Sequence, residues 1–193
     1  MKSPRWRVAI LDDHGPSRSD LAAAVVAAGG TVAETAEDAS AAVGVVGRAR
    51  PDVAIFAVGL RDGDGIDAAA AVMAAEPCPI VLFTSRRGDA LIERARRAGV
   101  MGYLLKPLRA EELPPVLDLA IACFAEIRDL RQRLEARKLI ERAKGLLMTR
   151  QGLAEEEAFR VLRRTAMNRR RSMAEVAQAV ILAESMGREA LAR

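Results

Sequence analysis

The sequence predicts an α/β fold with a doubly wound parallel sheet, then a long connecting helix and a small all-α bundle of three helices. Short apolar runs alternate with helical segments through residues 1–110, and helical periodicity then continues almost without a break. Charge also divides along the chain. Residues 1–127 hold 14 Lys and Arg against 17 Asp and Glu, a net of −3, whereas residues 128–193 hold 16 against 9, a net of +7. The total of +4 therefore conceals two parts of opposite charge.

The predicted strands are short apolar runs, and a helical segment follows each of them. Runs that are apolar throughout indicate parallel strands buried on both faces of the sheet. The strands are expected at 8–11, 31–34, 53–58, 80–83 and 101–105, and the helices at 16–28, 38–49, 65–75, 89–98 and from 109 onward. Sites in such sheets lie just beyond the carboxyl ends of the strands, which selects Asp12, Asp13, Ala57, Thr84 and Lys106.

Composition excludes several classes of protein. A hydrophobic fraction of 51% is ample for a core, and no apolar stretch approaches the roughly 18–20 residues of a membrane span. Two cysteines without metal-ligand spacing and a single histidine argue against a zinc site. No pair of nucleophile and base is visible, so we expect no enzyme. We expect a cytoplasmic protein with reduced thiols.

Separate motifs follow one another in the first part of the chain. They are Val-Ala-Ile-Leu-Asp-Asp-His at 8–14, Pro-Asp at 51–52 with Asp-Gly at 64–65, Leu-Phe-Thr-Ser at 82–85, and Gly-Tyr-Leu-Leu-Lys-Pro at 102–107. Together they resemble a response-regulator receiver domain, which we place at residues 1–121. The resemblance implies the flavodoxin-like strand order 2-1-3-4-5. It also implies a sensor kinase or another signalling protein as a partner.

The resemblance assigns roles to the residues at the strand ends. In receivers the acidic pair, here Asp12 and Asp13, holds Mg²⁺ through oxygen ligands. A hydroxyl residue and a lysine, here Thr84 and Lys106, contact the phosphoryl group carried by an aspartate on the third strand. Tyr103 matches the aromatic switch position, although packing alone would also explain an aromatic residue there.

Position 57 departs from the receiver pattern. The acceptor aspartate stands five residues after the Asp of Pro-Asp and eight before the Gly of Asp-Gly, and both counts give Ala57. Alanine has no oxygen and cannot form an acyl phosphate. Asp62 and Asp64 are poor substitutes because they lie on the following loop. The chain is either a natural pseudo-receiver switched by a partner or a variant with an introduced Asp→Ala change, and both interpretations stay open.

Two interpretations of the remaining acidic pocket also stay open. Asp12 and Asp13 either retain a Mg²⁺ site, or they belong to a structural network in which Lys106 pairs with a buried aspartate. His14 is interpreted as a loop residue beside the acidic pair rather than a catalytic base.

The helix that starts near residue 109 is expected to pack its first half on the sheet. Its second half, near 127–134, carries an apolar stripe of about two heptads, which is short of a secure coiled coil. We place a linker helix at 122–135 that is either a single helix or a short coiled coil joining two copies of the chain.

The basic part, residues 136–193, predicts three short amphipathic helices. Gly152 ends the first of them. Three glutamates at 155–157 favour the start of the second, for which Phe159 is expected to be a core residue. Ser172 and Glu175 form a capping box that starts the third.

Within residues 136–183, several residues form a specific pattern. They are Ile140, Ala143-Lys144-Gly145, Leu147-Met148, Gly152, Glu157-Ala158-Phe159, Leu162, Ala166-Met167-Asn168 and the region of Val176-Ala177. This pattern resembles the ANTAR domain, the RNA-binding output module of transcription antitermination regulators. The resemblance implies binding of paired RNA hairpins in leader transcripts by a homodimer.

RNA loops are recognised by cations on phosphates and by side chains that hydrogen-bond to or stack on splayed bases. Asn168 can hydrogen-bond to a base edge, and the cations can contact phosphates. No exposed aromatic residue is expected, so the guanidinium planes of arginines or Met167 would have to stack on the bases. Arg142 and Lys144 are expected to face solvent. The candidate RNA-binding residues are Arg142, Lys144, Arg150, Arg163, Arg164, Asn168, Arg169, Arg170 and Arg171.

The leading hypothesis is a response regulator that acts by RNA binding in transcription antitermination. Two alternatives from other classes remain. The basic bundle could bind DNA as a transcriptional regulator, although no helix-turn-helix signature is visible. The receiver-like domain could instead make the chain a protein-interaction adaptor controlled by a partner sensor.

Overall fold

The computed structural model describes residues 4–191, with side chains described through residue 186. The chain divides into two compact units, residues 1–126 and 127–193. The first contains a parallel sheet with helices and the second contains helices, which confirms the predicted fold class. Helix α5 (Leu113–Gln151) contributes residues to both units.

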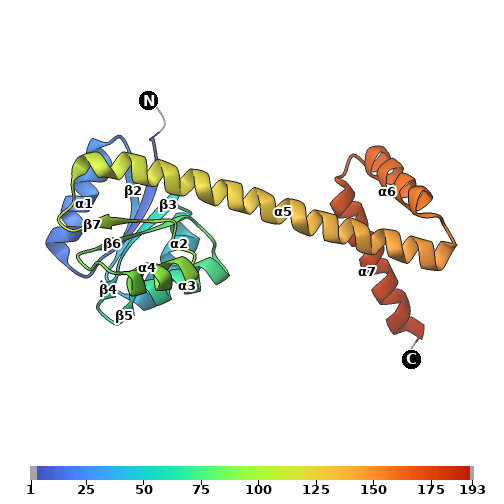
Figure 1. The fold of residues 1–193 in the computed structure, drawn as a ribbon, viewed down its shortest axis with the longest axis horizontal. Helices are drawn as coiled ribbons and strands as arrows, with labels where there is room; N and C mark the ends of the chain where they lie inside the picture. The colour runs from blue at the N-terminus through green and yellow to red at the C-terminus, as the bar shows by residue number, and fades with distance from the viewer. Residues whose placement is uncertain (1–3, 192–193) are drawn as a thin grey trace. The chain divides into compact units, whose positions relative to one another are not determined.

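A five-stranded parallel sheet forms the centre of the first unit (Figure 1). Its order, β2-β1-β3-β6-β7, is the 2-1-3-4-5 order that the receiver resemblance implies. A short antiparallel pair, β4 (Gly59–Leu60) and β5 (Gly63–Asp64), follows the central strand. The five strands are β1 (Arg7–Leu11), β2 (Thr31–Ala36), β3 (Val53–Ala57), β6 (Ile80–Thr84) and β7 (Gly102–Leu105).

Helices cover both faces of the sheet, because successive side chains of a buried strand point to opposite faces. Val8 and Ile10 of β1 join one core with α1 and the start of α5, whereas Ala9 and Leu11 join the other core with α2 and α3. Short 3₁₀ turns, η1 (Ala39–Ala41) and η2 (Ala110–Glu112), precede α2 and α5. The helices of this unit are α1 (Gly15–Ala27), α2 (Ala42–Ala49), α3 (Gly65–Ala75), α4 (Asp89–Arg97) and the first part of α5.

The first turns of α5 pack on the sheet as predicted. Leu113, Leu117 and Ala120 have no exposed surface and belong to the core that includes β1. The indole Nε1 of Trp6, just before β1, donates a hydrogen bond to Asp118 Oδ1 at 2.8 Å. An apolar face and the part-buried hydrogen bond of Trp6 thus attach this helix to the sheet.

The second unit is a bundle of the last part of α5 with α6 (Glu155–Arg169) and α7 (Met173–Leu191). Gly152, with φ of +67°, follows the end of α5, a backbone conformation that glycine adopts without strain. At the start of α7, Glu175 N donates to Ser172 Oγ at 3.2 Å and Ser172 N donates to the Glu175 carboxylate at 2.8 Å, the predicted capping box. The buried residues that join the helices are Ala143, Leu147, Ala158, Leu162, Ala166, Val176, Ala177 and Ile181.

Neither cysteine forms a disulfide. Burial raises the pKa of the Cys78 thiol to about 12, so this thiol stays protonated at neutral pH. Within residues 4–191, the structure contains no helix long and apolar enough to cross a membrane.

Gly65 begins α3 directly against the end of β3. A Cβ atom at this position would lie 1.8 Å from the carbonyl oxygen of Ala57, and Gly65 N donates a hydrogen bond to Val58 O at 2.7 Å. Because only main-chain movement relieves such a contact, Gly65→Ala should lower the free energy of unfolding by more than about 2 kcal/mol. Thermal unfolding followed by circular dichroism measures the loss.

The control is Gly145→Ala in the interior of α5, where an added Cβ meets no atom within 4 Å. Alanine favours a helix over glycine by about 1 kcal/mol, so this variant should be at least as stable as the unchanged chain. An unchanged melting temperature for Gly65→Ala would contradict the close approach of Gly65 to Ala57.

Candidate functional site

The carboxyl ends of four adjacent strands bring polar residues to one edge of the sheet. Asp12 follows β1, Ala57 ends β3, Thr84 ends β6 and Lys106 follows β7. The strands β1, β3, β6 and β7 are neighbours in the sheet, so residues distant in the sequence lie near one another at this edge. The edge is the place that strand order assigns to a site in this fold.

Asp12 is the buried charge of this edge, with 1% of its surface exposed. Lys106 Nζ forms an ion pair with Asp12 Oδ2 at 2.7 Å, and Ser17 Oγ donates to the same oxygen at 2.7 Å. The backbone N–H of His14 donates to Asp12 Oδ1 at 3.1 Å. Both carboxylate oxygens are therefore engaged, and the buried negative charge is compensated by a lysine.

The other residues of the edge make local contacts. Thr84 Oγ1 accepts a hydrogen bond from Arg86 N at 2.9 Å, while Asp13 is exposed. His14 Nδ1 accepts from Ser17 N at 3.3 Å and so caps α1. Tyr103, on β7, has 52% of its surface exposed.

Ala57 is buried at the end of β3, with its carbonyl oxygen against Gly65. The side chain at this position is a methyl group, which offers no nucleophile to a phosphoryl donor. The two nearby loop carboxylates have other partners. Asp62 accepts hydrogen bonds from Ser40 and Ala39. The hydrogen bond with the Ser40 side chain contributes most to lowering the pKa of Asp62. Asp64 caps α3 through Ile66 N at 2.7 Å.

The receiver resemblance implies a bound Mg²⁺, and the geometry of the edge provides a test of that fit. The carboxylate of Asp12 accepts three hydrogen bonds, one of them from Lys106, and the side chain of Ala57 supplies no oxygen. In the part of the chain that the structure describes, no three His, Cys, Asp or Glu residues gather in a metal-binding group. The donor set, in which a lysine pairs with the buried carboxylate, matches an ion-paired structural network rather than a cation site.

The exposed face of α6 carries a second set of candidate residues, with aromatic, basic and amide side chains. Ala158, Leu162 and Ala166 recur every four residues and are buried in the bundle. Other residues of the helix are exposed, with Phe159 at 41% and Met167 at 70%. A hollow of about 520 Å³ on this helix is lined by Leu153, Glu157, Arg160, Val161, Arg163, Arg164, Met167 and Asn168.

The prediction that Phe159 belongs to the core was wrong. It follows Ala158 by one residue, which turns its side chain by about 100° around the helix, away from the buried face. Phe159 borders a second hollow of about 430 Å³ together with Lys144, Glu155, Glu156 and Arg160. The candidate residues predicted from the sequence omitted Phe159 and Arg160, which the structure places at the surface of α6. A signal in the sequence was available. Phe159 stands four residues before Arg163, and Arg160 stands four residues before Arg164, a spacing that puts each pair on one face of a helix.

The candidate RNA-binding residues differ in their partners. Arg150 Nε donates to Glu184 at 2.9 Å and Arg171 donates to Glu175 at 3.1 Å, so both charges are paired. The remaining exposed members have no side-chain hydrogen bond or ion pair to the residues that the structure describes. They are Arg142, Arg163, Arg164, Asn168, Arg169 and Arg170.

Two models of known protein families match separate parts of the chain. A model of the response regulator receiver domain matches residues 8–118, and a model of the ANTAR domain matches residues 128–181. Transcriptional regulatory protein PdtaR of Mycobacterium tuberculosis is 40% identical over 188 residues, which cover 94% of this chain and 91% of that protein. The chain belongs to the response regulators with a receiver and an ANTAR domain.

Further relatives match one part each. The Nitrate regulatory protein of Klebsiella oxytoca is 43% identical over 63 residues, 33% of this chain and 16% of that protein. The receiver domain of response regulator NarL from Mycobacterium tuberculosis superimposes with a TM-score of 0.56 at 27% identity, covering 64% of this chain and 98% of that structure. The receiver domain of a modulated diguanylate cyclase from Desulfovibrio desulfuricans gives a TM-score of 0.58 at 28% identity, covering 62% and 96%.

Lys144 of the ANTAR domain does not face solvent as expected, because it is 8% exposed. Its Nζ lies 2.7 Å from Glu155 Oε1 of α6 and 2.9 Å from Glu141 Oε2 of α5. The hydrogen bond to Glu155 raises the pKa of Lys144, and the same bond lowers the pKa of Glu155. The ion pair joins the start of α6 to α5, which makes Lys144 a structural residue of the bundle.

The pKa shifts predict how the stability of the bundle depends on pH. Glu155 contributes above its unfolded pKa of about 4.3, and its contribution is lost as pH falls through the lower folded pKa. Lys144 contributes below about pH 10.4, and its contribution is lost as pH rises through its higher folded pKa. Glu155→Gln should therefore lower the melting temperature at pH 7, with a difference that disappears in acid.

Thermal unfolding of the full chain, followed between about pH 3 and about pH 8, measures this effect. Glu156→Gln is the matched control, since it removes an equal charge from the same first turn of α6 and Glu156 has no ion pair with a described residue. Equal losses for the two variants would show that the helix dipole, and not Lys144, accounts for the effect.

Proposed function

We propose that this protein is a cytoplasmic regulator that binds RNA hairpins through the exposed face of α6 and acts in transcription antitermination. The observation that carries the proposal is the composition of that face. It presents the aromatic ring of Phe159, the amide of Asn168, and guanidinium groups that have no partner among the described residues, including Arg163 and Arg164.

Each of these groups matches one requirement of RNA-loop recognition. A splayed base stacks on an aromatic ring or a guanidinium plane, an amide hydrogen-bonds to a base edge, and arginines contact phosphates. The hollow beside Arg164 and Asn168 has room for a base, and Leu153, Val161 and Met167 give it apolar walls. Unpaired arginines bind an anion without first breaking an internal ion pair, which favours Arg163 and Arg164 over Arg150 and Arg171.

The apolar stripe of α5 supports a homodimer as the binding species. Ile127, Leu130 and Leu134 are 38%, 58% and 53% exposed and lie on one face of the helix at spacings of three and four residues. Such a stripe packs against the same stripe of a second copy in a short coiled coil. Two bundles in one dimer would then contact two hairpins of one transcript.

The receiver is proposed to take its signal from a partner protein without phosphorylation at position 57. Ala57 removes the acceptor, and Asp62 and Asp64 are held by hydrogen bonds with Ala39, Ser40 and Ile66. A sensor kinase or another signalling protein can still recognise the folded receiver as a surface. The same hypothesis covers a natural pseudo-receiver and an introduced Asp→Ala change.

RNA binding is tested with a two-hairpin RNA selected from the leader transcripts of the host. Arg163→Gln and Arg164→Gln should each weaken binding and reduce the salt dependence of log K by about 0.7 per lost phosphate contact. Phe159→Leu keeps an apolar side chain but removes the ring, so it should cost about 1–3 kcal/mol if a base stacks there. Fluorescence anisotropy at several salt concentrations measures all three.

Arg133→Gln is the control for charge, because Arg133 pairs with Asp129 at 2.8 Å on α5 and lies outside the face of α6. It should retain the affinity of the unchanged chain. Unchanged affinity for the three α6 variants would remove this face from the RNA site. Equal affinity for duplex DNA and the hairpin RNA would favour the DNA-binding alternative.

The state of the receiver is tested with acetyl phosphate. The unchanged chain should keep its mass, measured by intact-protein mass spectrometry, and should remain a dimer by light scattering with or without the donor. Ala57→Asp, which restores the carboxylate, should gain one phosphoryl group and serves as the positive control. A gain of mass by the unchanged chain would reveal another acceptor, and a monomer under both conditions would contradict the proposed dimer.

A further inference from the structure

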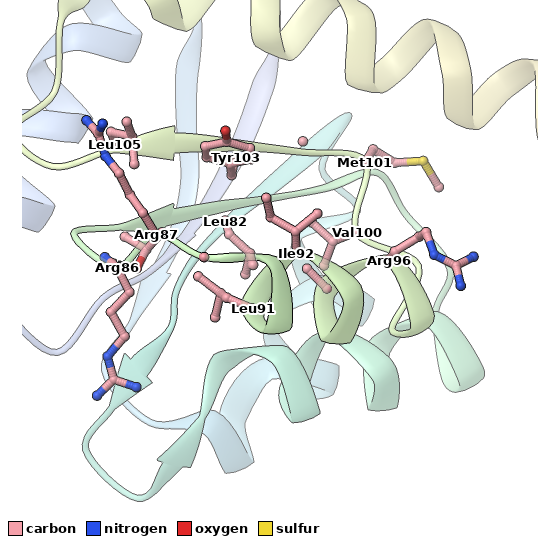
Figure 2. A pocket seen from close by; sticks show the side chains of 14 residues that line it. Leu82, Arg86, Arg87, Leu91, Ile92, Arg96, Val100, Met101, Tyr103 and Leu105 are labelled. Atoms are coloured by element: carbon pink, nitrogen blue, oxygen red, sulfur yellow. Dashed lines mark hydrogen bonds between the residues drawn. The ribbon is translucent and has the colours of Figure 1, made fainter.

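The first unit contains a hollow of about 340 Å³ between α4 and the strands β6 and β7 (Figure 2). It extends from the half-exposed rim residues Ile92 and Tyr103 to Leu82, a residue of β6 that is 1% exposed. A volume of this size lies within the range of about 300–1,000 Å³ of small-molecule pockets. Because its lining runs from exposed to buried residues, the hollow reaches from the surface to the sheet.

The packing of α4 explains why the hollow exists. This helix has no buried residue, and only partly buried side chains such as Leu91 and Ala95 attach it to the core. Its sequence is rich in charge, Asp-Ala-Leu-Ile-Glu-Arg-Ala-Arg-Arg, so few large apolar side chains are available to fill the space above β6. The walls that remain are mostly apolar, and they bury apolar surface when a ligand enters.

The charges around the hollow are all positive. Arg86 and Arg87 lie at one end and Arg96 lies at the other, with apolar side chains between them (Figure 2). Glu93 neutralises Arg96 through two hydrogen bonds of 2.8 and 2.9 Å. The side chains of Arg86 and Arg87 have no partner among the described residues, and none of the described residues that line the hollow is acidic.

We propose that this hollow is a binding site for a small, mostly apolar organic anion. The apolar part of the ligand lies between α4 and β7, and its carboxylate or sulfonate lies at the end marked by Arg86 and Arg87. The unpartnered guanidinium groups of Arg86 and Arg87 beside apolar walls favour such an anion as the occupant.

The site is connected to the polar edge of the sheet. Thr84 lines the hollow, and its hydroxyl accepts a hydrogen bond from Arg86 N at 2.9 Å. Lys106 N donates to Thr84 O at 2.9 Å, and Lys106 Nζ pairs with Asp12. A ligand held by Arg86 thus contacts a segment whose hydrogen bonds continue to the buried aspartate, which provides an input that needs no phosphoryl group.

The test uses 8-anilinonaphthalene-1-sulfonate, a fluorescent apolar anion, and its uncharged relative N-phenyl-1-naphthylamine. With the full chain, the sulfonate should give a saturable rise in fluorescence at one site. Because a charge-assisted hydrogen bond contributes roughly tenfold or more in affinity, the double variant Arg86→Gln and Arg87→Gln should weaken the sulfonate by about tenfold. The same variant should leave binding of the uncharged dye within about twofold.

Two further variants separate the hollow from the general surface. Ala95→Leu places a larger side chain in the hollow and should weaken both dyes. Arg97→Gln removes an arginine from the same helix that does not line the hollow, and it should weaken neither. Circular dichroism establishes that each variant is folded, and the loop variants Arg86→Gln and Arg87→Gln keep the test decisive if Ala95→Leu is unstable.

Three results would overturn the proposal. One is sulfonate binding that neither the arginine pair nor Ala95→Leu alters, which would place the dye elsewhere. Another is a loss of sulfonate affinity with Arg97→Gln equal to that with the arginine pair, which would show attraction to surface charge alone. The third is sulfonate binding that falls as chain concentration rises and returns with Ile92→Asp, which would show that a second copy fills the hollow.

Discussion

Both folded units depend on apolar residues of one helix, α5. Its first turns bury Leu113, Leu117 and Ala120 against the sheet, and its last turns bury Ala143 and Leu147 in the ANTAR bundle. Three short amphipathic helices are only marginally stable unless they pack together. Because α5 supplies one of the three helices of the bundle, the output domain cannot form its core without the helix that also covers the receiver.

In the receiver pocket, the buried charge of Asp12 is compensated by residues of the same chain. In the absence of an aspartate at position 57, Lys106 and Ser17 both bond to Asp12, and the buried negative charge is satisfied within the chain. Removing one partner of such a buried pair is costly, because the other charge is then left uncompensated. The receiver fold and its strand-end geometry are thus present with an alanine, which has no carboxylate, at position 57.

Charge compensation also distinguishes the cations of the ANTAR domain from one another. Lys144, Arg150 and Arg171 neutralise carboxylates of neighbouring helices or turns, and these pairs stabilise the bundle. Arg163 and Arg164 have no such partner in the part of the chain that the structure describes. The pairs of Lys144, Arg150 and Arg171 with glutamates cancel in the net charge of +7 of residues 128–193, whereas Arg163 and Arg164 are among the cations that contribute to it.

The sequence by itself determined the features that depend on local periodicity. Apolar runs located the strands, spacing of three and four located the helices, Gly152 and Ser172 located two helix boundaries, and strand ends located Asp12, Ala57 and Lys106. These signals are local because backbone geometry repeats every two residues in a strand and every 3.6 in a helix.

Only the tertiary structure decided which side chains have partners. The burial of Lys144 depends on Glu155, eleven residues away, and the ion pair of Asp12 depends on Lys106, ninety-four residues away. Phe159 is exposed because the bundle buries the neighbouring Ala158. The hollow beneath α4 likewise exists because a strand and a helix from different segments leave space between them. Such contacts join distant parts of the chain, so no local pattern contains them.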